Sequence, residues 1–588
     1  MTTGQTALKL LRYRPGLFLA TIFFRGLDDI APFFTGLIMK AFFDALTGHA
    51  DAGFTAWTLV ALFVVLEGVD RVVLFAAALV GARWYFAVQS LLRKNMLEAV
   101  LQVRHPRAVS GSSGEVTNRF RDDVQAVTSY LEQYIHLWGN MIFAGLAVSY
   151  MAKIDVAVTA VTVMPCVLII TVVNVARRHI RRFRTAQRVA TERATNFANE
   201  MFQSVLAVQV ATTEGHTVSH FRDLNDARRK STLVDNLFNQ LLMSINFNIS
   251  HISTGVILLL VADQMQAGTF SVGDFALFTT YVSEVARSGA LVGSVMAQHK
   301  RAEVSLGRMA LTIEEESPAA LVAYGPIYLK ESPPPVGVEQ RSEADILQEL
   351  EITSLSHVFA GSENGVRGID LRIQPGTFNV VTGRIGAGKT TLLRTVLGVL
   401  PLQSGEIRWN GEPVADPKTF FAPPRCAYTS QVPRLFSETL ADNILMGLPG
   451  GEEVLQRAVR LGVMEEDLPT LELGLETIVG PRGVKLSGGQ VQRTAAARMF
   501  VREAELYVFD DLSSALDVET ENLLWDRVFA ARQGACLVVS HRRPALQRAD
   551  QIVVLKEGRV EAVGRLQELL TSCEEMQRLW RGDLGSDG

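Results

Sequence analysis

The chain has few cysteines and no pattern among them. Its 588 residues include four, and no two stand in C-x-x-C spacing. Scattered cysteines argue against a disulfide framework and against a zinc site, so we expect them to be packing residues. They are Cys166, Cys426, Cys536 and Cys573.

An excess of charge of either sign is also missing. The formal net charge is −4, from 57 basic and 61 acidic residues, so the composition gives no reason to expect a nucleic-acid partner. Coiled-coil heptads, which a soluble ATPase acting on DNA would carry, are absent from the sequence as well. The composition therefore points away from a DNA-associated protein.

Long apolar runs, by contrast, are plentiful in the first 310 residues. Mean hydropathy is +0.19, and hydrophobic residues make up 48% of the chain. Because a helix of about 20 apolar residues crosses a bilayer, we predict membrane spans rather than the buried helices of a large soluble domain. The six predicted spans are residues 17–46, 54–82, 134–152, 156–176, 239–262 and 272–297.

The distribution of basic residues orients these spans. Segments 93–121 and 177–230 are rich in arginine, whereas segments 47–53 and 263–271 contain neither lysine nor arginine. Basic loops stay on the cytoplasmic side of a membrane. We therefore expect both termini, and everything after the last span, to be cytoplasmic.

Charged residues interrupt the first two spans. Each costs about 2.5–3.5 kcal/mol at the centre of a bilayer, so we expect it to face a partner or a wet cavity. One interpretation is a polar cavity for a transported substrate, and the other is a set of ion pairs between helices. The residues are Arg25, Asp28, Asp29, Glu67, Asp70 and Arg71, joined by the polar Asn246, Asn248 and His251 of the fifth span.

A phosphate-binding loop follows in the second half. The motif G-x-x-x-x-G-K-[ST] comes after an apolar strand at residues 378–381 and opens a helix, the context that this motif requires. Its backbone N–H groups bind phosphates, Lys389 reaches the terminal phosphates, and the Thr390 hydroxyl ligates Mg²⁺. The predicted nucleotide-binding residues are Gly383, Arg384, Ile385, Gly386, Ala387, Gly388, Lys389, Thr390 and Thr391.

A second group of motifs decides the kind of nucleotide-binding protein. Its most specific member is the pentapeptide Leu486-Ser487-Gly488-Gly489-Gln490. Around it, in order, are Ser430-Gln431, the apolar strand 506–509 ending in Asp510, Ser514-Ala515-Leu516-Asp517, and the strand 536–540 ending at His541. Over about residues 350 to 570 the chain thus resembles the nucleotide-binding domain of ATP-binding cassette (ABC) proteins.

The membrane half resembles the exporter-type half-transporters of the same family. The matching segments are Gly114-Glu115 with Asp122-Asp123-Val124, residues 200–214, and residues 268–274. The resemblance implies a six-helix all-α transmembrane domain (1–312) and an α/β P-loop ATPase domain (350–588). The composition of the segment between them (313–349) predicts a charged, proline-rich linker with little ability to pack. The resemblance also implies long helices that extend beyond the membrane and short transverse helices near 121–127 and 205–212.

The resemblance assigns roles to the remaining site residues. Two ATPase domains enclose two MgATP, so Ser487, Gly488, Gly489 and Gln490 of one chain would cap the γ-phosphate held by the other. Gln431 would contact Mg²⁺ and the attacking water, and Asp510 would hold Mg²⁺. His541 would contact the γ-phosphate, and Phe359 would stack on adenine unless it is a core residue of its strand.

Two departures from the family pattern affect the catalytic prediction. Efficient members have glutamate directly after the strand-ending aspartate, where this chain has Asp511. In the family, aspartate here marks the degenerate site of a heterodimer, although a slower homodimer with Asp511 as the base is the alternative. The segment Thr477-Ile478-Val479-Gly480-Pro481-Arg482-Gly483 also lacks the two glutamates that the family often places there.

We therefore expect one half of a dimeric, ATP-driven transporter in a bacterial inner membrane. Export of an amphipathic small molecule, peptide or lipid is favoured. Alternatives are an importer of metal-chelate compounds with the same fold and, less favoured, a regulatory or channel-type family member. A peptide-processing exporter is not expected, because the ~16 residues before the first span are too few for a protease domain.

Overall fold

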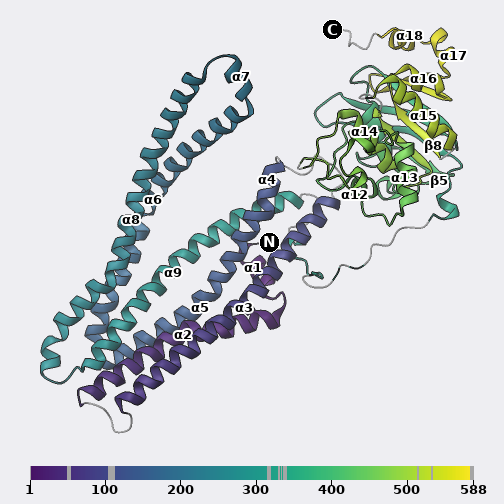
Figure 1. Cartoon of the computed structure of the whole chain (residues 1–588). Helices are drawn as coiled ribbons and strands as arrows, with labels where there is room; N and C mark the ends of the chain where they lie inside the picture. The colour runs from purple at the N-terminus through teal and green to yellow at the C-terminus, as the bar shows by residue number, and fades with distance from the viewer. Residues whose placement is uncertain are drawn as a thin grey trace. The chain divides into compact units, whose positions relative to one another are not determined.

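The chain divides into two compact units between residues 331 and 332, and each is described here by itself. Figure 1 shows the computed structural model. It describes residues 2–48, 55–102, 113–313, 319–328, 332, 334, 341–481, 483–512, 516–531 and 534–582. Within these ranges, the side chains of 102, 113, 165–181, 242, 245–247, 249 and 250 are not described.

The first unit is helical throughout its regular structure (Figure 1). Two of its long helices begin at side-chain caps: the Asp155 carboxylate accepts from the Val158 N–H at 2.9 Å at the start of α6, and Ser271 and Asp274 form a capping box at the start of α9. The helices are α1 (Thr3–Leu11), α2 (Pro15–Leu46), α3 (Ala56–Gln102), α4 (Ser113–Asn118), a π-helical turn (Arg119–Asp123), α5 (Val124–Ile154), α6 (Val156–Gln203), α7 (Val205–Val210), α8 (Glu214–Gln266) and α9 (Val272–Ala310).

The predicted spans overlap, in order, α2, α3, α5, α6, α8 and α9, so their described residues are almost wholly helical. Among the described residues, one helical segment, Gly114–Ile154, is long enough, apolar enough and poor enough in charged residues to cross a membrane. Large apolar side chains nevertheless face outward along α2, α3 and α8: Phe23 is 61% exposed, Val72 69% and Leu259 82%. Such a surface is typical of a protein that meets an apolar partner or lipid.

The short helix predicted near 205–212 is present as α7, but the one predicted near 121–127 is wrong. There the chain runs from α4 through the π-helical turn directly into α5. Two buried side chains fix this turn against α9 and the 3₁₀ turn Leu311–Ile313 that follows it. Arg119 donates to the Thr312 hydroxyl at 3.1 Å, and Asp123 accepts from the Ser305 hydroxyl at 2.7 Å.

The predicted linker packs more than its composition suggested. Residues 319–328, which include a 3₁₀ turn (Ala320–Val322), lie against α1 and α3, and Leu321 and Val322 are buried in the core of the first unit. Asn95 of α3 donates to the Leu321 carbonyl at 2.9 Å, and Tyr13 donates to the Gly325 carbonyl at 3.2 Å. The expectation of little packing is therefore wrong for residues 319–328, because apolar side chains of this stretch are buried in the core of the first unit although charged and proline-rich segments flank it.

The second unit is an α/β domain built on two sheets. A six-stranded sheet has the order β10-β9-β3-β8-β7-β6, and a four-stranded antiparallel sheet has the order β2-β1-β4-β5. The strands are β1 (Leu350–Val358), β2 (Gly365–Ile373), β3 (Phe378–Gly383), β4 (Ser404–Trp409), β5 (Glu412–Pro413), β6 (Cys426–Thr429), β7 (Leu506–Asp510), β8 (Ala535–Val539), β9 (Gln551–Lys556) and β10 (Arg559–Gly564).

Helices cover these sheets and leave two apolar cores on either side of the larger one. They are α10 (Lys389–Val396), α11 (Pro417–Phe420), α12 (Leu440–Leu445), α13 (Glu452–Leu461), α14 (Gly488–Phe500), α15 (Val518–Ala531), α16 (Arg543–Arg548), α17 (Leu566–Ser572) and α18 (Glu574–Arg581), with 3₁₀ turns at Glu343–Asp345, Leu468–Thr470 and Gly474–Glu476. The described cysteines, Cys426, Cys536 and Cys573, are free and buried in these cores. Cys166 lies outside the described side chains.

Candidate nucleotide site

The order of the larger sheet brings the separate sequence motifs to one edge. Strands β3, β8, β7 and β6 are parallel neighbours, with Val380 opposite Val538 and Val508 opposite Leu537. Their carboxyl ends therefore meet at the same edge of the sheet, where α/β proteins bind ligands. The phosphate loop follows β3, Asp510 ends β7, His541 follows β8, and Gln431 follows β6.

The phosphate loop has the backbone that its glycines permit. Gly386 and Gly388 have φ of 85° and 98°, in the left-handed region that a side chain disfavours. A Cβ on Gly388 would meet Val366 Cγ1 at 2.8 Å and the Gly365 carbonyl at 3.0 Å. The loop thus presents bare backbone at the start of α10, as a phosphate site requires.

Lys389 is held by the loop it belongs to. Its Nζ donates to the carbonyls of Gly383 at 2.7 Å and of Arg384 at 2.8 Å. Burial lowers the pKa of this lysine, and the nearby carboxylates of Asp511 and Asp510 act in the opposite direction. The ammonium therefore lies beside the loop and close to the acidic groups of β7, where a terminal phosphate would compensate its charge.

Thr390 and Asp510 form a pair of oxygen ligands. The Thr390 hydroxyl donates to Asp510 Oδ1 at 2.8 Å, and the Tyr428 hydroxyl lies 3.4 Å from Asp510 Oδ2. Asp510 has no exposed surface, and burial raises its pKa while the bond from Thr390 opposes that rise. A hydroxyl and a buried carboxylate at hydrogen-bond distance fit Mg²⁺, which prefers few protein oxygens and completes its shell with phosphate and water.

Asp511 occupies a strained position directly after β7. Its φ is 54°, and its N–H donates to the Val539 carbonyl at 3.1 Å. Gln431 Nε2 donates to Asp511 Oδ2 at 3.3 Å, whereas Oδ1 is buried and has no hydrogen-bond partner among the described residues. Burial raises the pKa of Asp511, and His541 and Gln431 moderate the rise. The structure thus brings three predicted catalytic residues, Asp511, Gln431 and His541, together.

The predicted signature residues form the start of α14, away from any strand end. Ser487 caps the helix: its hydroxyl accepts from the Gln490 N–H at 3.2 Å, and its own N–H donates to Gln490 Oε1 at 2.9 Å. Ser487 and Gly488 are exposed. The start of α14 is therefore accessible to a ligand.

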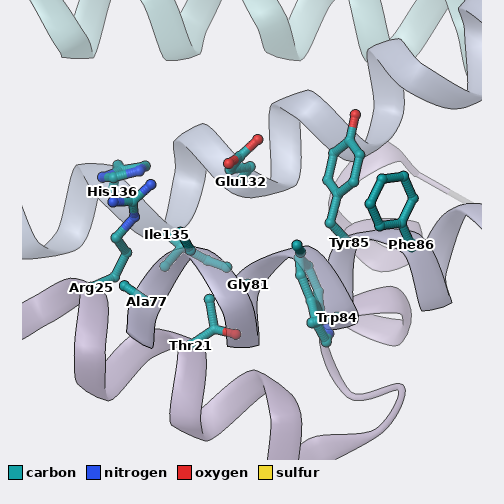
Figure 2. Close-up of a pocket in the computed structure, with 12 residues that line it drawn as sticks. Thr21, Arg25, Ala77, Gly81, Trp84, Tyr85, Phe86, Glu132, Ile135 and His136 are labelled. Carbon is teal, nitrogen blue, oxygen red and sulfur yellow. The ribbon is translucent and has the colours of Figure 1, made fainter. Parts of the chain in front are cut away.

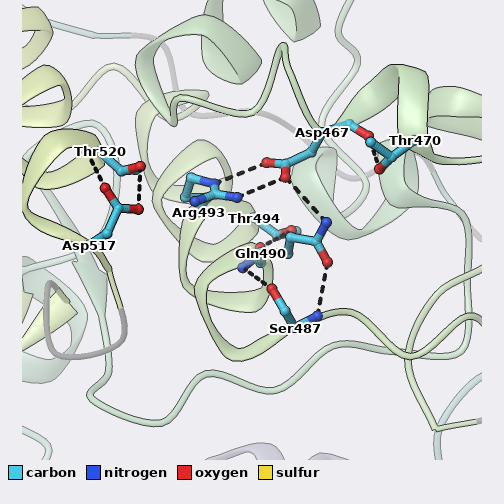
Figure 3. A network of polar contacts seen from close by, with 8 residues as sticks. All are labelled: Asp467, Thr470, Ser487, Gln490, Arg493, Thr494, Asp517 and Thr520. Atoms are coloured by element: carbon cyan, nitrogen blue, oxygen red, sulfur yellow. Dashed lines mark hydrogen bonds and ion pairs between the residues drawn. The ribbon is translucent and has the colours of Figure 1, made fainter.

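A carboxylate that the sequence analysis missed fixes this helix start (Figure 3). Asp467 accepts from Arg493 Nε at 3.0 Å and Nη2 at 2.7 Å, and from Gln490 Nε2 at 3.2 Å. Arg493 and Asp467 are 15% and 14% exposed, so their fork-shaped pair is largely shielded from water. No sequence motif marks Asp467, because it lies 20 residues before Ser487 in an irregular segment.

Other predicted residues have different surroundings from those expected. The Arg384 side chain pairs with Glu575 of α18 at 2.7 Å, with the two side chains 14% and 3% exposed, so it supports the loop from behind. Ile385 is 84% exposed. Phe359 follows β1, half-buried, with its ring 4.9 Å from that of His357, so adenine stacking stays a prediction. Ser514, Ala515 and Arg482 lie outside the described residues.

The charged residues of the spans pair mostly with near neighbours. Arg25 contacts Asp28 at 3.3 Å, and Arg71 contacts Asp70 at 2.8 Å and Glu67 at 3.8 Å. Asp29 instead accepts from Asn140 of α5 at 2.9 Å. His251 is exposed, Asn248 donates to the Ser244 carbonyl at 2.8 Å, and the Asn246 side chain is not described. A substrate-cavity role for these residues therefore stays a prediction.

Comparison with known protein families agrees with this geometry. The model described as "ABC transporter" matches residues 366–514, and the model described as "ABC transporter transmembrane region" matches residues 17–287. The chain belongs to the ABC transporter family. Membership confirms a transmembrane region followed by an ATP-binding ATPase domain.

Individual relatives of this ABC transporter differ in length. ABC transporter C family member 3 of Arabidopsis thaliana is 24% identical over 95% of the chain, but the chain spans only 35% of that protein. The ATP-dependent lipid A-core flippase of Aromatoleum aromaticum is 27% identical over 92% of the chain and 90% of its own length. The fold is that of a bacterial Atm1-family ABC exporter with ATP bound, at TM-score 0.70, 18% identity, and coverage of 98% and 99%.

Proposed function

We propose that the chain is one half of a dimeric exporter that moves an amphipathic molecule across the bacterial inner membrane at the expense of ATP. The observation that carries the proposal is the group formed by Lys389, Thr390, Asp510, Asp511 and Gln431 at one sheet edge. The similarity to a lipid A-core flippase over nearly the full length of both chains supports a lipid-like cargo and an inner-membrane location.

Each residue at the edge has a distinct task in binding ATP. The loop N–H groups and the α10 N-terminus hold the β- and γ-phosphates, and Lys389 leaves its own loop carbonyls to neutralise the γ-phosphate. Thr390 and Asp510, with Gln431 nearby, would hold Mg²⁺, which when bound neutralises charge on the phosphate oxygens. Phe359 would supply the stacking surface for adenine.

Hydrolysis requires a base and a second chain. Asp511, positioned by Gln431 beside His541, would accept the proton of the attacking water. Exposed Ser487 and Gly488 at the start of α14 would cap the γ-phosphate bound to the partner chain. Closing of two such domains around two ATP would drive the long helices of the first unit from inward-facing to outward-facing.

We further propose that the partner is a different chain. Aspartate is one methylene shorter than the glutamate that efficient relatives carry, and a misplacement of about 1 Å can cost ~100-fold in rate. The signature residues keep a complete capping arrangement with Asp467 behind it. An intact signature beside a shortened base suits a subunit whose signature completes the faster site of its partner.

The test is the mass and ATPase rate of the chain alone in lipid nanodiscs, with His541→Ala as the catalytic variant and Lys389→Ala as the background. We expect a monomer, or a dimer with negligible turnover, until a partner with glutamate at the Asp511 position is co-expressed. Brisk turnover by the chain alone, lost in His541→Ala, would instead establish a homodimer. Turnover equal in all three proteins would contradict an ATPase role for this site.

A further inference from the structure

A cavity of about 320 Å³ lies in the first unit among α2, α3 and α5. In Figure 2, Arg25 and His136 lie at one end, the aromatic residues Trp84, Tyr85 and Phe86 lie at the other, and Glu132 lies between them. The α3 wall between the ends consists of small residues such as Ala77 and Gly81, which is why the space stays open.

The basic groups of this cavity already have acidic partners. Arg25 contacts Asp28 at 3.3 Å, and both side chains are about four-fifths buried, at 21% and 19% exposure. His136 Nδ1 lies 3.4 Å from Asp29 Oδ1, which also accepts from Asn140 at 2.9 Å. An anionic ligand would therefore have to displace carboxylates that are already in place.

The acidic group of the cavity lacks such a partner. Glu132 lines the cavity without an ion pair or hydrogen bond to any described residue. Asp29 Oδ2 is buried and likewise has no hydrogen-bond partner among the described residues. Of the charged residues that line the cavity, Arg25 and His136 each have a carboxylate partner, Asp28 and Asp29, which lie outside the lining. Glu132, an exposed residue, is the charged lining residue left without a described partner, and a cationic ligand would balance its charge.

The aromatic end adds attraction of the same sign. The rings of Tyr85 and Phe86 lie 5.6 Å apart, edge to face, and Trp84 is 2% exposed beside them. Aromatic faces attract organic cations, and they also bury the apolar part of an amphipathic molecule. One carboxylate beside three aromatic rings is a suitable arrangement for a lipophilic amine or quaternary cation.

We propose that this cavity binds an amphipathic organic cation, with Glu132 as the charge partner and Trp84, Tyr85 and Phe86 as the apolar wall. The inference rests on the proposed transport function, because it takes the bound cation to be the cargo. It assigns a site within a single chain, and it predicts that an anionic amphiphile of the same shape is rejected.

Two probes of equal shape and opposite charge test the proposal: tetraphenylphosphonium and tetraphenylborate. Equilibrium binding of radiolabelled tetraphenylphosphonium to the full chain in nanodiscs is measured without ATP, with empty nanodiscs subtracted. We expect saturable binding that tetraphenylborate does not displace. Because no nucleotide is present, this result stands or fails separately from the ATPase measurements that test the proposed function.

Matched variants locate the site. Glu132→Gln should weaken tetraphenylphosphonium binding about tenfold, whereas Glu192→Gln, the same change at an exposed position of α6, should not. Gly81→Leu should abolish binding by filling the cavity, since a Cβ there meets only Thr21 Cγ2 at 3.7 Å and the rest of the side chain enters the open space. Gly68→Leu, on the same helix with nothing within 4 Å, is its control.

The outcomes separate the possible cargoes. Unchanged affinity in Glu132→Gln, or equal binding of tetraphenylborate, would overturn the proposal. Binding lost equally in both glycine variants would place the cation elsewhere in the first unit and would also overturn it. Binding that depends on Glu132 in a protein without ATPase activity would leave the cation site intact while the proposed function fails.

Discussion

Replacing Asp511 with glutamate should raise the ATPase rate of this chain. Asp511 Oδ2 accepts a hydrogen bond from Gln431 at 3.3 Å, and Oδ1 is buried without a described partner. The carboxylate therefore makes one long hydrogen bond to a described side chain and no short one. One additional methylene moves the carboxylate by about 1 Å, and a gain of up to ~100-fold follows if reach alone limits the rate. That gain corresponds to about 2.7 kcal/mol of activation free energy.

The substitution has a cost that can be measured separately. The φ of 54° at Asp511 lies in the left-handed region, which aspartate tolerates better than glutamate, so Asp511→Glu should lose roughly 1 kcal/mol of stability. Because this strain is present in both the ground state and the transition state, it lowers the melting temperature and leaves the gain in rate intact.

The assay is steady-state ATP hydrolysis at saturating MgATP, in nanodiscs that each hold enough copies of the chain for two of them to pair. Asp526→Glu is the matched control, since Asp526 is 62% exposed and pairs with Arg548 on the domain surface. An unchanged rate in Asp511→Glu, with ATP binding and folding preserved, would refute the idea that side-chain length limits this site.

Three further predictions follow from the same domain. Burial raises the pKa of Asp511 above the ordinary 3.8, so the free energy of unfolding should fall as pH rises through the raised pKa. Asp511→Asn should therefore be more stable than the wild type at neutral pH. Chemical denaturation should show this difference vanishing near pH 3.8. Asp467→Ala should cost about 2–3 kcal/mol in the same assay and lower kcat with ATP affinity unchanged, because it frees the signature helix start but not the phosphate loop. Gly388→Ala should abolish ATP binding in a filter assay, because its Cβ would meet Val366 at 2.8 Å, while circular dichroism should show that the fold persists. Gly411→Ala is the control: Gly411 has a φ of 84° and nothing within 4 Å of its Cβ position, so this variant should bind ATP normally.

Much of the architecture could be predicted from local patterns. Long apolar runs and the phosphate-loop motif depend on residues close together in sequence, so the long helices and the β3–loop–α10 unit follow from them. The π-helical turn Arg119–Asp123 could not be predicted, because it depends on contacts of Arg119 with Thr312 and of Asp123 with Ser305. Those partners lie more than 180 residues away along the chain.

The candidate site shows the same division. Gln431, Asp511 and His541 are separated by long stretches of sequence, and only the strand order of the larger sheet brings them together. Asp467 and Glu575 hold the signature and the phosphate loop from behind, and neither belongs to a motif. Supporting residues of this kind escape sequence reasoning because any acidic residue at the right point in space can serve.

The pair formed by α6 and α8 has a mechanical consequence. With 48 and 53 residues these helices are continuous rods, and at 1.5 Å per residue the longer one measures ~80 Å. Figure 1 shows α7 at their shared end, where Leu206 is 73% exposed and Val210 is 77% exposed. A tilt of about 10° around the midpoint of such a helix moves the α7 end by ~7 Å. A small rotation of this helical hairpin therefore displaces α7 by more than the rise of one helical turn.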